Sequence, residues 1–273
     1  MPLRQYPEML ERLYGELNRR RYVHPDPLEF LYDNESAADR EVVALVASSL
    51  AYGRVKQILR SVSAVLAKLG PRPARRLADT TPSQLKRSLA GFRHRFNSGE
   101  NVAAMLLGAK RVIGRHGSLE ACFREGLRPG DQTVLPALWG FVGSITEAAG
   151  PNCGHLLPDP ARGSSCKRLN LMLRWLVRRD DVDPGGWSAV GPERLIVPLD
   201  THMHRIALAL GMTTRKTPDI RTALEVTAAF RRISPADPVR YDFALTRLGI
   251  RDEMDAGSFI DGCRARCKEN ASA

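Results

Sequence analysis

Hydrophobic residues recur along this chain at helical spacing, and no segment alternates between polar and apolar positions as a half-buried strand does. The clearest stretch is 55–69, where Val55, Ile58, Leu59 and Val62 form one apolar stripe. The pattern predicts an all-α protein without strands. The predicted helices span residues 5–20, 38–51, 55–69, 83–91, 100–115, 118–126, 132–148, 166–179, 201–210, 217–232 and 239–248.

The segment 38–51 is apolar on nearly every side, which is typical of a helix at the centre of a core. It ends at Tyr52-Gly53, where glycine is a common stop. Two proline-containing stretches, 70–82 and 150–163, interrupt the helical pattern and are predicted to be loops. The arginine cluster in the first of them is more typical of a solvated surface than of a phosphate site.

A lysine opens one of the predicted helices. Ser164 or Ser165 is a good N-cap for the helix 166–179, and Lys167 lies in its first turn. The positive end of the helix dipole disfavours an ammonium there and favours a free amine. A free amine is a nucleophile that can form a Schiff base with a sugar carbon.

An aspartate opens the predicted helix 201–210. Asp200 directly follows the apolar run 195–199 and lies at the start of this helix, where capping hydrogen bonds keep a carboxylate ionised. Such a carboxylate accepts a proton from an amine or stabilises positive charge on a ribose ring. Lys167 and Asp200 are 33 positions apart, so the two helix starts can face one cleft. The alternative is that Asp200 only caps its helix and Lys167 is a surface charge.

No metal site is predicted beside Asp200. His202 and His204 are two positions apart on a helix, so they point in different directions, and the i, i+4 spacing of a metal-binding pair is absent. Cys263 and Cys267 lack the second pair that a zinc site needs. We therefore expect neither a metal nor a cofactor.

Composition narrows the class of partner. The 273 residues carry a formal net charge of +11 with a pI of about 9.8, which favours a polyanion such as nucleic acid, although a generally basic proteome gives the same balance. Five scattered cysteines argue for a reducing compartment without disulfides. No apolar run approaches the length of a membrane span. A cytoplasmic protein is expected.

The run from Leu199 to Arg205, L-D-T-H-M-H-R, resembles the V-D-T-H-V-x-R motif of the helix-hairpin-helix DNA glycosylase superfamily. The resemblance implies that Asp200 is the catalytic aspartate, with Thr201, His202 and Arg205 also matching. It makes Lys167 the Schiff-base lysine and places Tyr52 at a helix end that faces the minor groove. More closely, residues 163–170 to 237–244 look like an uncharacterised bacterial family of glycosylase-like proteins. The lysine–aspartate spacing is similar to that of archaeal 8-oxoguanine glycosylases.

The chain departs from the superfamily pattern in three places. The L-P-G-V-G hairpin that binds a DNA phosphate ahead of the lysine is absent, and the backbone amides of Gly163, Ser164, Ser165 and Cys166 are the expected replacement. The four-cysteine signature is missing, so no iron–sulfur cluster is expected. Leu50 stands where endonuclease III has a glutamine, which puts the contact to the opposite base in doubt.

The resemblance implies a two-lobe fold, with residues 36–197 in one lobe and residues 1–35 plus 198–273 in the other. The expected activity is that of a DNA glycosylase with AP-lyase activity on duplex DNA carrying a damaged base, for which oxidised purine is the best expectation. The expected DNA contacts are Tyr52, Gly163, Ser164, Ser165, Cys166, His202 and Arg205, in a monomer associated with the nucleoid. Two alternatives are a non-catalytic nucleic-acid binder on the same scaffold and a basic helical protein unrelated to DNA.

Overall fold

The computed structural model describes residues 7–34, 36–150, 153–250, 257 and 259–263, and its helices confirm the all-α prediction. The α-helices are α1 (Pro7–Leu17), α2 (Ala37–Ser49), α3 (Val55–Leu69), α4 (Pro73–Asp79), α5 (Pro82–Ser88), α6 (Gly99–His116), α7 (Leu119–Glu125), α8 (Leu135–Ala149), α9 (Lys167–Val177), α10 (Thr201–Ala209), α11 (Ile220–Ile233) and α12 (Asp242–Ile250). Short 3₁₀ turns are η2 (Arg20–Tyr22), η3 (Pro27–Leu31), η4 (Pro160–Arg162) and η5 (Pro192–Arg194).

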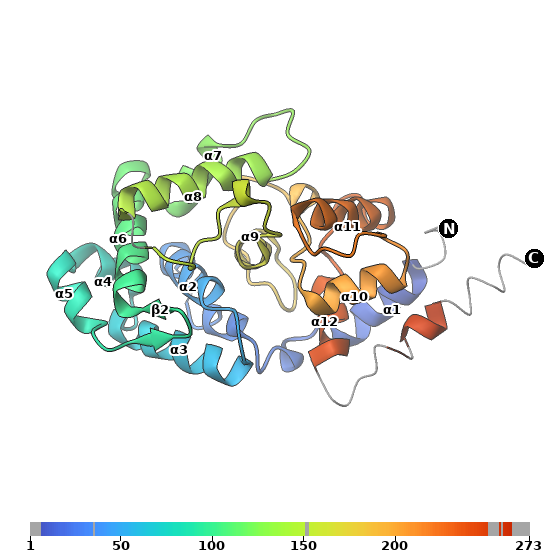
Figure 1. Ribbon diagram of the computed structural model, residues 1–273, viewed down its shortest axis with the longest axis horizontal. Coiled ribbons are helices and arrows are strands. Elements are labelled where there is room, and N and C mark those ends of the chain that lie inside the picture. Colours follow the sequence, from blue (N-terminus) through green and yellow to red (C-terminus); the bar gives the residue numbers. More distant parts are fainter. Residues whose placement is uncertain (1–6, 35, 151–152, 251–256, 258, 264–273) are drawn as a thin grey trace, which may run out of the picture.

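Helix α2 lies in the core, as its apolar sequence predicts. Every residue from Glu41 to Ser49 is buried, and the helix packs against α9, η3 and α4. Figure 1 shows α9 in the middle of the view, with α2 to α8 on one side and α1 and α10 to α12 on the other. Helix α1 packs against α12, which brings the two ends of the described chain together. The position of α9 puts its first residue, Lys167, between these two groups of helices.

The prediction of a loop over 70–82 is wrong, because most of that stretch is helical. Pro73 and Pro82 each occupy the first turn of a short helix, where proline has no amide to lose. Thr81 and Gln84 form a capping box that fixes the start of α5. Proline was interpreted as a helix breaker in this stretch, whereas it marks two helix starts.

The prediction that the chain has no strands is also wrong. Strands β1 (Arg93–His94) and β2 (Asn97–Ser98) pair antiparallel, with Arg93 opposite Ser98 and His94 opposite Asn97. Strands of two residues are too short to show an alternating pattern. They lie beside α3 in Figure 1.

Three helix starts lie three residues further along the chain than predicted, and the first is that of α8, at Leu135. Helix α11 begins at Ile220 because Asp219 is its N-cap and accepts a hydrogen bond from the amide of Thr222 at 2.9 Å. Helix α12 begins at Asp242. Cys263 is buried, whereas Cys267 and most of the tail lie outside the described residues.

Candidate functional site

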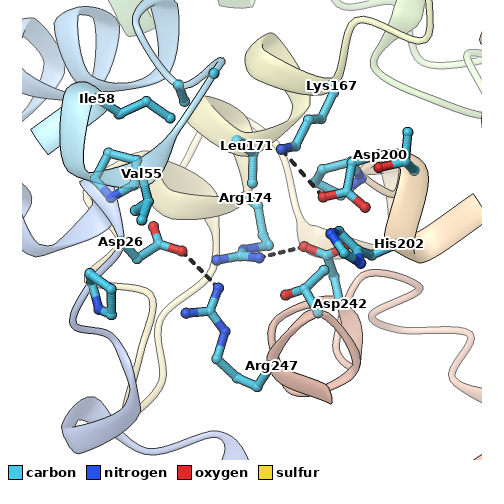
Figure 2. Close-up of a pocket in the computed structure, with 17 residues that line it drawn as sticks. Asp26, Val55, Ile58, Lys167, Leu171, Arg174, Asp200, His202, Asp242 and Arg247 are labelled. Atoms are coloured by element: carbon cyan, nitrogen blue, oxygen red, sulfur yellow. Dashed lines mark hydrogen bonds and ion pairs between the residues drawn. The ribbon is translucent and has the colours of Figure 1, made fainter. Parts of the chain in front are cut away.

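Helices α9 and α10 begin side by side and bring Lys167 and Asp200 into contact. The amine Nζ lies 3.3 Å from Oδ2 of Asp200, and the two side chains are 34% and 15% exposed. Asp200 is the N-cap of α10, and its Oδ1 accepts a hydrogen bond from the amide of Met203 at 2.8 Å. One carboxylate oxygen therefore caps the helix while the other faces the amine, so the capping role and the paired role coexist (Figure 2).

The chain before each helix holds the pair in place. Leu195, Ile196, Val197 and Leu199 are buried, and this apolar segment carries Asp200 up to the surface of the core. The hydroxyl of Ser165 donates a hydrogen bond to the carbonyl of Leu199 at 3.2 Å. The loop before Lys167 is thus bonded to the segment before Asp200.

The expectation that Ser164 or Ser165 caps α9 is wrong. The N-cap is Cys166, which has a left-handed backbone with φ +50° and no capping side chain. The Ser164 hydroxyl accepts from the amide of Cys166 at 3.3 Å, and the Ser165 hydroxyl is bonded to Leu199. Burial raises the pKa of the Cys166 thiol to about 11, so at neutral pH it stays protonated. Gly163 is left-handed as well, with φ +77°.

A pocket of about 300 Å³ opens beside the lysine and the aspartate. Its mouth carries Lys167, Asp200 and His202, and Figure 2 shows their side chains close together. Apolar side chains form much of its wall. These apolar lining residues are Pro25, Pro27, Ala51, Val55, Ile58, Leu171 and Pro198.

Buried charges form the floor of the pocket. Arg174 pairs with Asp242 and also with Asp183, to which Nε lies at 3.2 Å, and Arg247 pairs with Asp26 at 2.9 Å. Oδ1 of Asp242 is buried and has no hydrogen-bond partner among the residues that the structure describes. Burial raises the pKa of Asp242 to about 6 against the opposing charge of Arg174, and the nearby charge of Asp200 raises it further.

These floor residues were missed by the reasoning from sequence. Arg174 interrupts the apolar run 171–177 of α9, and this interruption was the available signal for a buried charge. Asp242 and Arg247 belong to the last predicted helix, and Asp26 to a proline-containing loop. Nothing in the local pattern shows that the three lie around one pocket, because they are brought together only by tertiary packing.

The other residues expected to contact DNA lie at different distances from the pocket. His202 lines it, whereas Arg205 is exposed on α10 and Tyr52 is half-buried beside it, between the lining residues Ala51 and Gly53. The Tyr52 hydroxyl donates to the carbonyl of His94 at 3.1 Å, and the Arg168 guanidinium lies over its ring at 4.8 Å.

His204 has a structural role. It is buried, and Nε2 lies 2.8 Å from the carbonyl oxygen of Arg215. Among the residues that the structure describes, no group of three or more His, Cys, Asp or Glu side chains could hold a metal ion. No helix within the same residues is long and apolar enough to cross a membrane.

Fold and site together define an all-α protein with a lysine–aspartate pair at the mouth of a pocket. The chain belongs to the family described as a protein of unknown function, DUF2400, whose model matches residues 26–251. No curated protein and no solved structure matches the chain significantly. The matched range includes Lys167, Asp200 and Asp242, so the pair and the pocket floor lie within the family's own domain.

Proposed function

We propose that this protein is a DNA glycosylase with AP-lyase activity, and that Lys167 is its nucleophile. The observation that carries the proposal is the 3.3 Å contact between Nζ of Lys167 and Oδ2 of Asp200 at the mouth of a pocket. A nucleophilic amine needs a neighbouring group that accepts its proton, and Asp200 is held for that purpose by its own helix cap.

In the proposed reaction Asp200 takes a proton from Nζ, and the free amine attacks C1′ of an extruded nucleotide. The bond from C1′ to the base breaks, and the base leaves with that electron pair and takes a proton from the new ammonium on C1′. Ring opening at O4′, which receives the proton from Asp200, gives a protonated Schiff base between Nζ and C1′. Loss of a C2′ proton and departure of the 3′ phosphate then cleave the strand.

The pocket fits an extruded base. Its apolar walls exclude water from a flat ring, and its floor offers a few polar groups that orient one. The unpartnered Oδ1 of Asp242 accepts an N–H. An 8-oxopurine carries an N–H at N7 where the undamaged purine has a bare acceptor nitrogen, so an oxidised purine is the substrate that we propose.

The lining of the pocket supports the proposed two-lobe arrangement. Seven lining residues come from residues 36–197: Ala51, Gly53, Val55, Ile58, Lys167, Leu171 and Arg174. The other ten come from residues 1–35 and 198–273. The latter are Pro25, Asp26, Pro27, Pro198, Asp200, Thr201, His202, Asp242, Thr246 and Arg247. A cleft between two lobes would have this mixed lining.

We propose that the backbone at the start of α9 replaces the missing phosphate-binding hairpin. The amides of Gly163 and Cys166 already donate, to the carbonyl of Pro160 at 3.4 Å and to the Ser164 hydroxyl at 3.3 Å. The donors that we propose are therefore the amides of Ser164 and Ser165 and those of the first turn of α9, an 11-residue helix whose N-terminus has no side-chain cap. Uncapped amides and the helix dipole together bind a phosphate oxygen. A phosphate held there would place its nucleotide beside Lys167.

Borohydride trapping tests the lysine directly. Wild-type protein should form a covalent adduct with duplexes that carry 8-oxoguanine or an abasic site, because borohydride reduces the Schiff base to a stable amine. Lys167→Ala should abolish the adduct, and Lys216→Ala, which removes an exposed lysine outside the pocket, should leave it unchanged.

The same assay separates the alternatives. Salt-sensitive binding to duplex DNA without any adduct would contradict the glycosylase proposal and favour a non-catalytic nucleic-acid binder on this scaffold. Absence of duplex binding at low salt would contradict both. An adduct that survives Lys167→Ala would show that another amine reacts.

A further inference from the structure

Residues 54–87 carry most of the positive charge of the protein. This segment contains nine Lys or Arg residues and one acidic residue, Asp79, so it accounts for +8 of the net +11. Of the 41 Lys or Arg and 30 Asp or Glu residues in the chain, the remainder holds 32 and 29, which nearly balance. The excess is therefore local, whereas a generally basic proteome would spread it along the chain. We call the nine basic side chains of residues 54–87 the basic track.

The side chains of the basic track are free to contact a partner. All nine are exposed, on α3, α4 and α5 or at the residue that precedes α3 or α4. Among the described residues, Arg75 is the one member of the track with an ion pair, to Asp79 at 3.7 Å. Arginines elsewhere are used inside the fold, since Arg174 and Arg178 are buried and each pairs with two or more aspartates.

The basic track begins at the pocket and runs away from it. The first turn of α3 supplies the pocket-lining residues Val55 and Ile58, and Lys56 lies between them in the sequence. The 15 residues of α3 span about 22 Å at the usual helical rise. Helix α4 packs against α3, and α4 and α5 lie at one end of the molecule in Figure 1. The positive charge therefore extends from the pocket in one direction.

A groove at the far end of α3 gathers four side chains of the track. It measures about 400 Å³, and its charged lining residues are Lys68, Arg72, Arg75, Arg76 and Asp79. The sequence pattern favoured a solvated surface for this arginine cluster, because it also predicted a loop over 70–82. Since α4 is a helix, its arginines are instead held in fixed positions along one concave surface. Such a surface suits a ligand with several negative charges.

We propose that the basic track binds the phosphates of one arm of a DNA duplex, the arm that leaves the pocket along α3. A duplex rises about 3.4 Å per base pair, so the length of α3 corresponds to roughly six to seven base pairs. The groove beside α4 would hold the DNA backbone at that distance from the nucleotide in the pocket. The inference rests on the proposed DNA substrate but is independent of the chemistry of Lys167.

The character of this surface favours nucleic acid over an acidic protein. Interfaces between proteins depend on a few aromatic, arginine or aliphatic anchors that become buried in pockets. The exposed positions of α4 and α5 hold charged and polar residues, alanine and proline, and those of α3 between Arg60 and Lys68 are Ser63, Ala64 and Ala67. Small side chains let a sugar–phosphate backbone approach closely, and the charges on either side of them neutralise it.

The opposite side of the pocket has a weaker charge. Residues 198–249, which supply seven of the lining residues, contain eight Lys or Arg and five Asp or Glu residues, a net charge of +3. Each phosphate that a Lys or Arg neutralises releases counterions and adds salt-dependent affinity. The two arms of a bound duplex should therefore contribute unequally, with the larger share from the arm on the basic track.

The test compares two duplexes whose arms differ in length. Each contains a tetrahydrofuran abasic analogue, which cannot form a Schiff base, so the assay reports binding alone. One duplex has about twelve base pairs on the 5′ side of the analogue and about three on the 3′ side, and the other has these lengths reversed. A loop closes each short arm so that it stays paired. Wild-type protein should bind one duplex about ten-fold more tightly than the other, and the difference should shrink as the salt concentration rises.

A triple variant locates the preference on α4. Replacing Arg72, Arg75 and Arg76 by glutamine removes three charges and leaves good helix formers in place. This variant should lose about ten-fold in affinity for the preferred duplex and almost none for the other, so that the two bind alike. The slope of log affinity against log salt on the preferred duplex should fall by about two to three.

A matched control removes the same charge elsewhere. Arg115, Arg124 and Arg128 are exposed on α6, on α7 and just after α7. Their joint replacement by glutamine should leave the preference between the two duplexes unchanged.

The outcomes separate the track from the glycosylase. Equal binding of the two duplexes by the wild type would overturn the track, as would an equal loss of affinity for both duplexes in the α4 variant. Loss of the preference in the control variant would show that net charge alone decides, and would overturn the assignment to α3–α5. A track-dependent preference in a protein that forms no Lys167 adduct would uphold the track and overturn the glycosylase. Failure of the wild type to bind duplex DNA would overturn both.

Discussion

Replacing Asp200 separates its structural role from its proposed chemical role, because its two oxygens have different partners. Asparagine keeps an oxygen that accepts from the amide of Met203 but carries no charge toward Lys167, and alanine keeps neither. Loss of a helix cap costs about 1 kcal/mol. The ion pair is partly exposed and contributes about 0–1 kcal/mol. Asp200→Ala should therefore lower the unfolding free energy by about 1–2 kcal/mol, and Asp200→Asn by less than 1 kcal/mol.

Excision should follow a different order from stability. Both variants remove the proton acceptor, so each should slow single-turnover base excision by roughly 10²–10⁴-fold. Urea unfolding followed by circular dichroism gives the stabilities, and excision on an 8-oxoguanine duplex gives the rates. If Asp200→Asn were as unstable as Asp200→Ala, the capping hydrogen bond would not account for the contribution of Asp200 to stability. If it excised at the wild-type rate, the carboxylate would not be the base.

Three further predictions concern the described core. Burial raises the pKa of Asp242 to about 6 from an ordinary 3.8, so between about pH 4 and 6 the folded state holds a proton that the unfolded state has released. In urea titrations at each pH, the wild type should therefore lose stability relative to Asp242→Asn as the pH rises through this range. The Glu41 carboxylate accepts hydrogen bonds from the amides of Leu119 and Glu120 at 3.0 and 2.9 Å and from the Trp187 indole. Glu41→Ala should therefore lower the unfolding free energy by about 3 kcal/mol or more in the same assay, and Glu41→Gln, which keeps one acceptor oxygen, should lower it by less. Gly108→Ala should lower the unfolding free energy by about 1–3 kcal/mol because its Cβ would lie 2.4 Å from the Ile145 carbonyl oxygen. An unchanged urea midpoint would show that α6 and α8 can move apart to make room for the methyl group.

The fold class and the start of α10 could be predicted from local pattern because each depends on neighbouring residues. The apolar run before Asp200 and the lack of any polar face on α2 are properties of short segments. The capping bond from Met203 follows from the preference of aspartate for that position. Such features need no knowledge of distant contacts.

The pocket floor and the hairpin of β1 and β2 could not be predicted, because they arise from packing between distant segments. Arg174 and Asp242 are separated by 68 positions, and no local sequence pattern around either residue predicts that the two pair. The capping residue of α9 was misassigned because the Ser165 hydroxyl donates to the carbonyl of Leu199, a partner 34 residues away that replaces the local cap. Local propensity predicts a cap at this position, and a tertiary hydrogen bond replaces it.

The charges of Asp200 and Asp242 are coupled, and this coupling gives a last prediction. The charge of Asp200 is one cause that raises the pKa of Asp242, so removing that charge should lower the pKa of Asp242. Asp200→Asn is the suitable change because it retains an acceptor for the cap of α10. The measurement compares two stability differences as functions of pH. The first is between the wild type and Asp242→Asn, and the second is between Asp200→Asn and the double variant with Asp242→Asn. The pH at which the difference changes should be lower for the second. An unmoved pH would mean that solvent screens the two carboxylates from each other, and the mouth and the floor of the pocket would then bind a substrate independently.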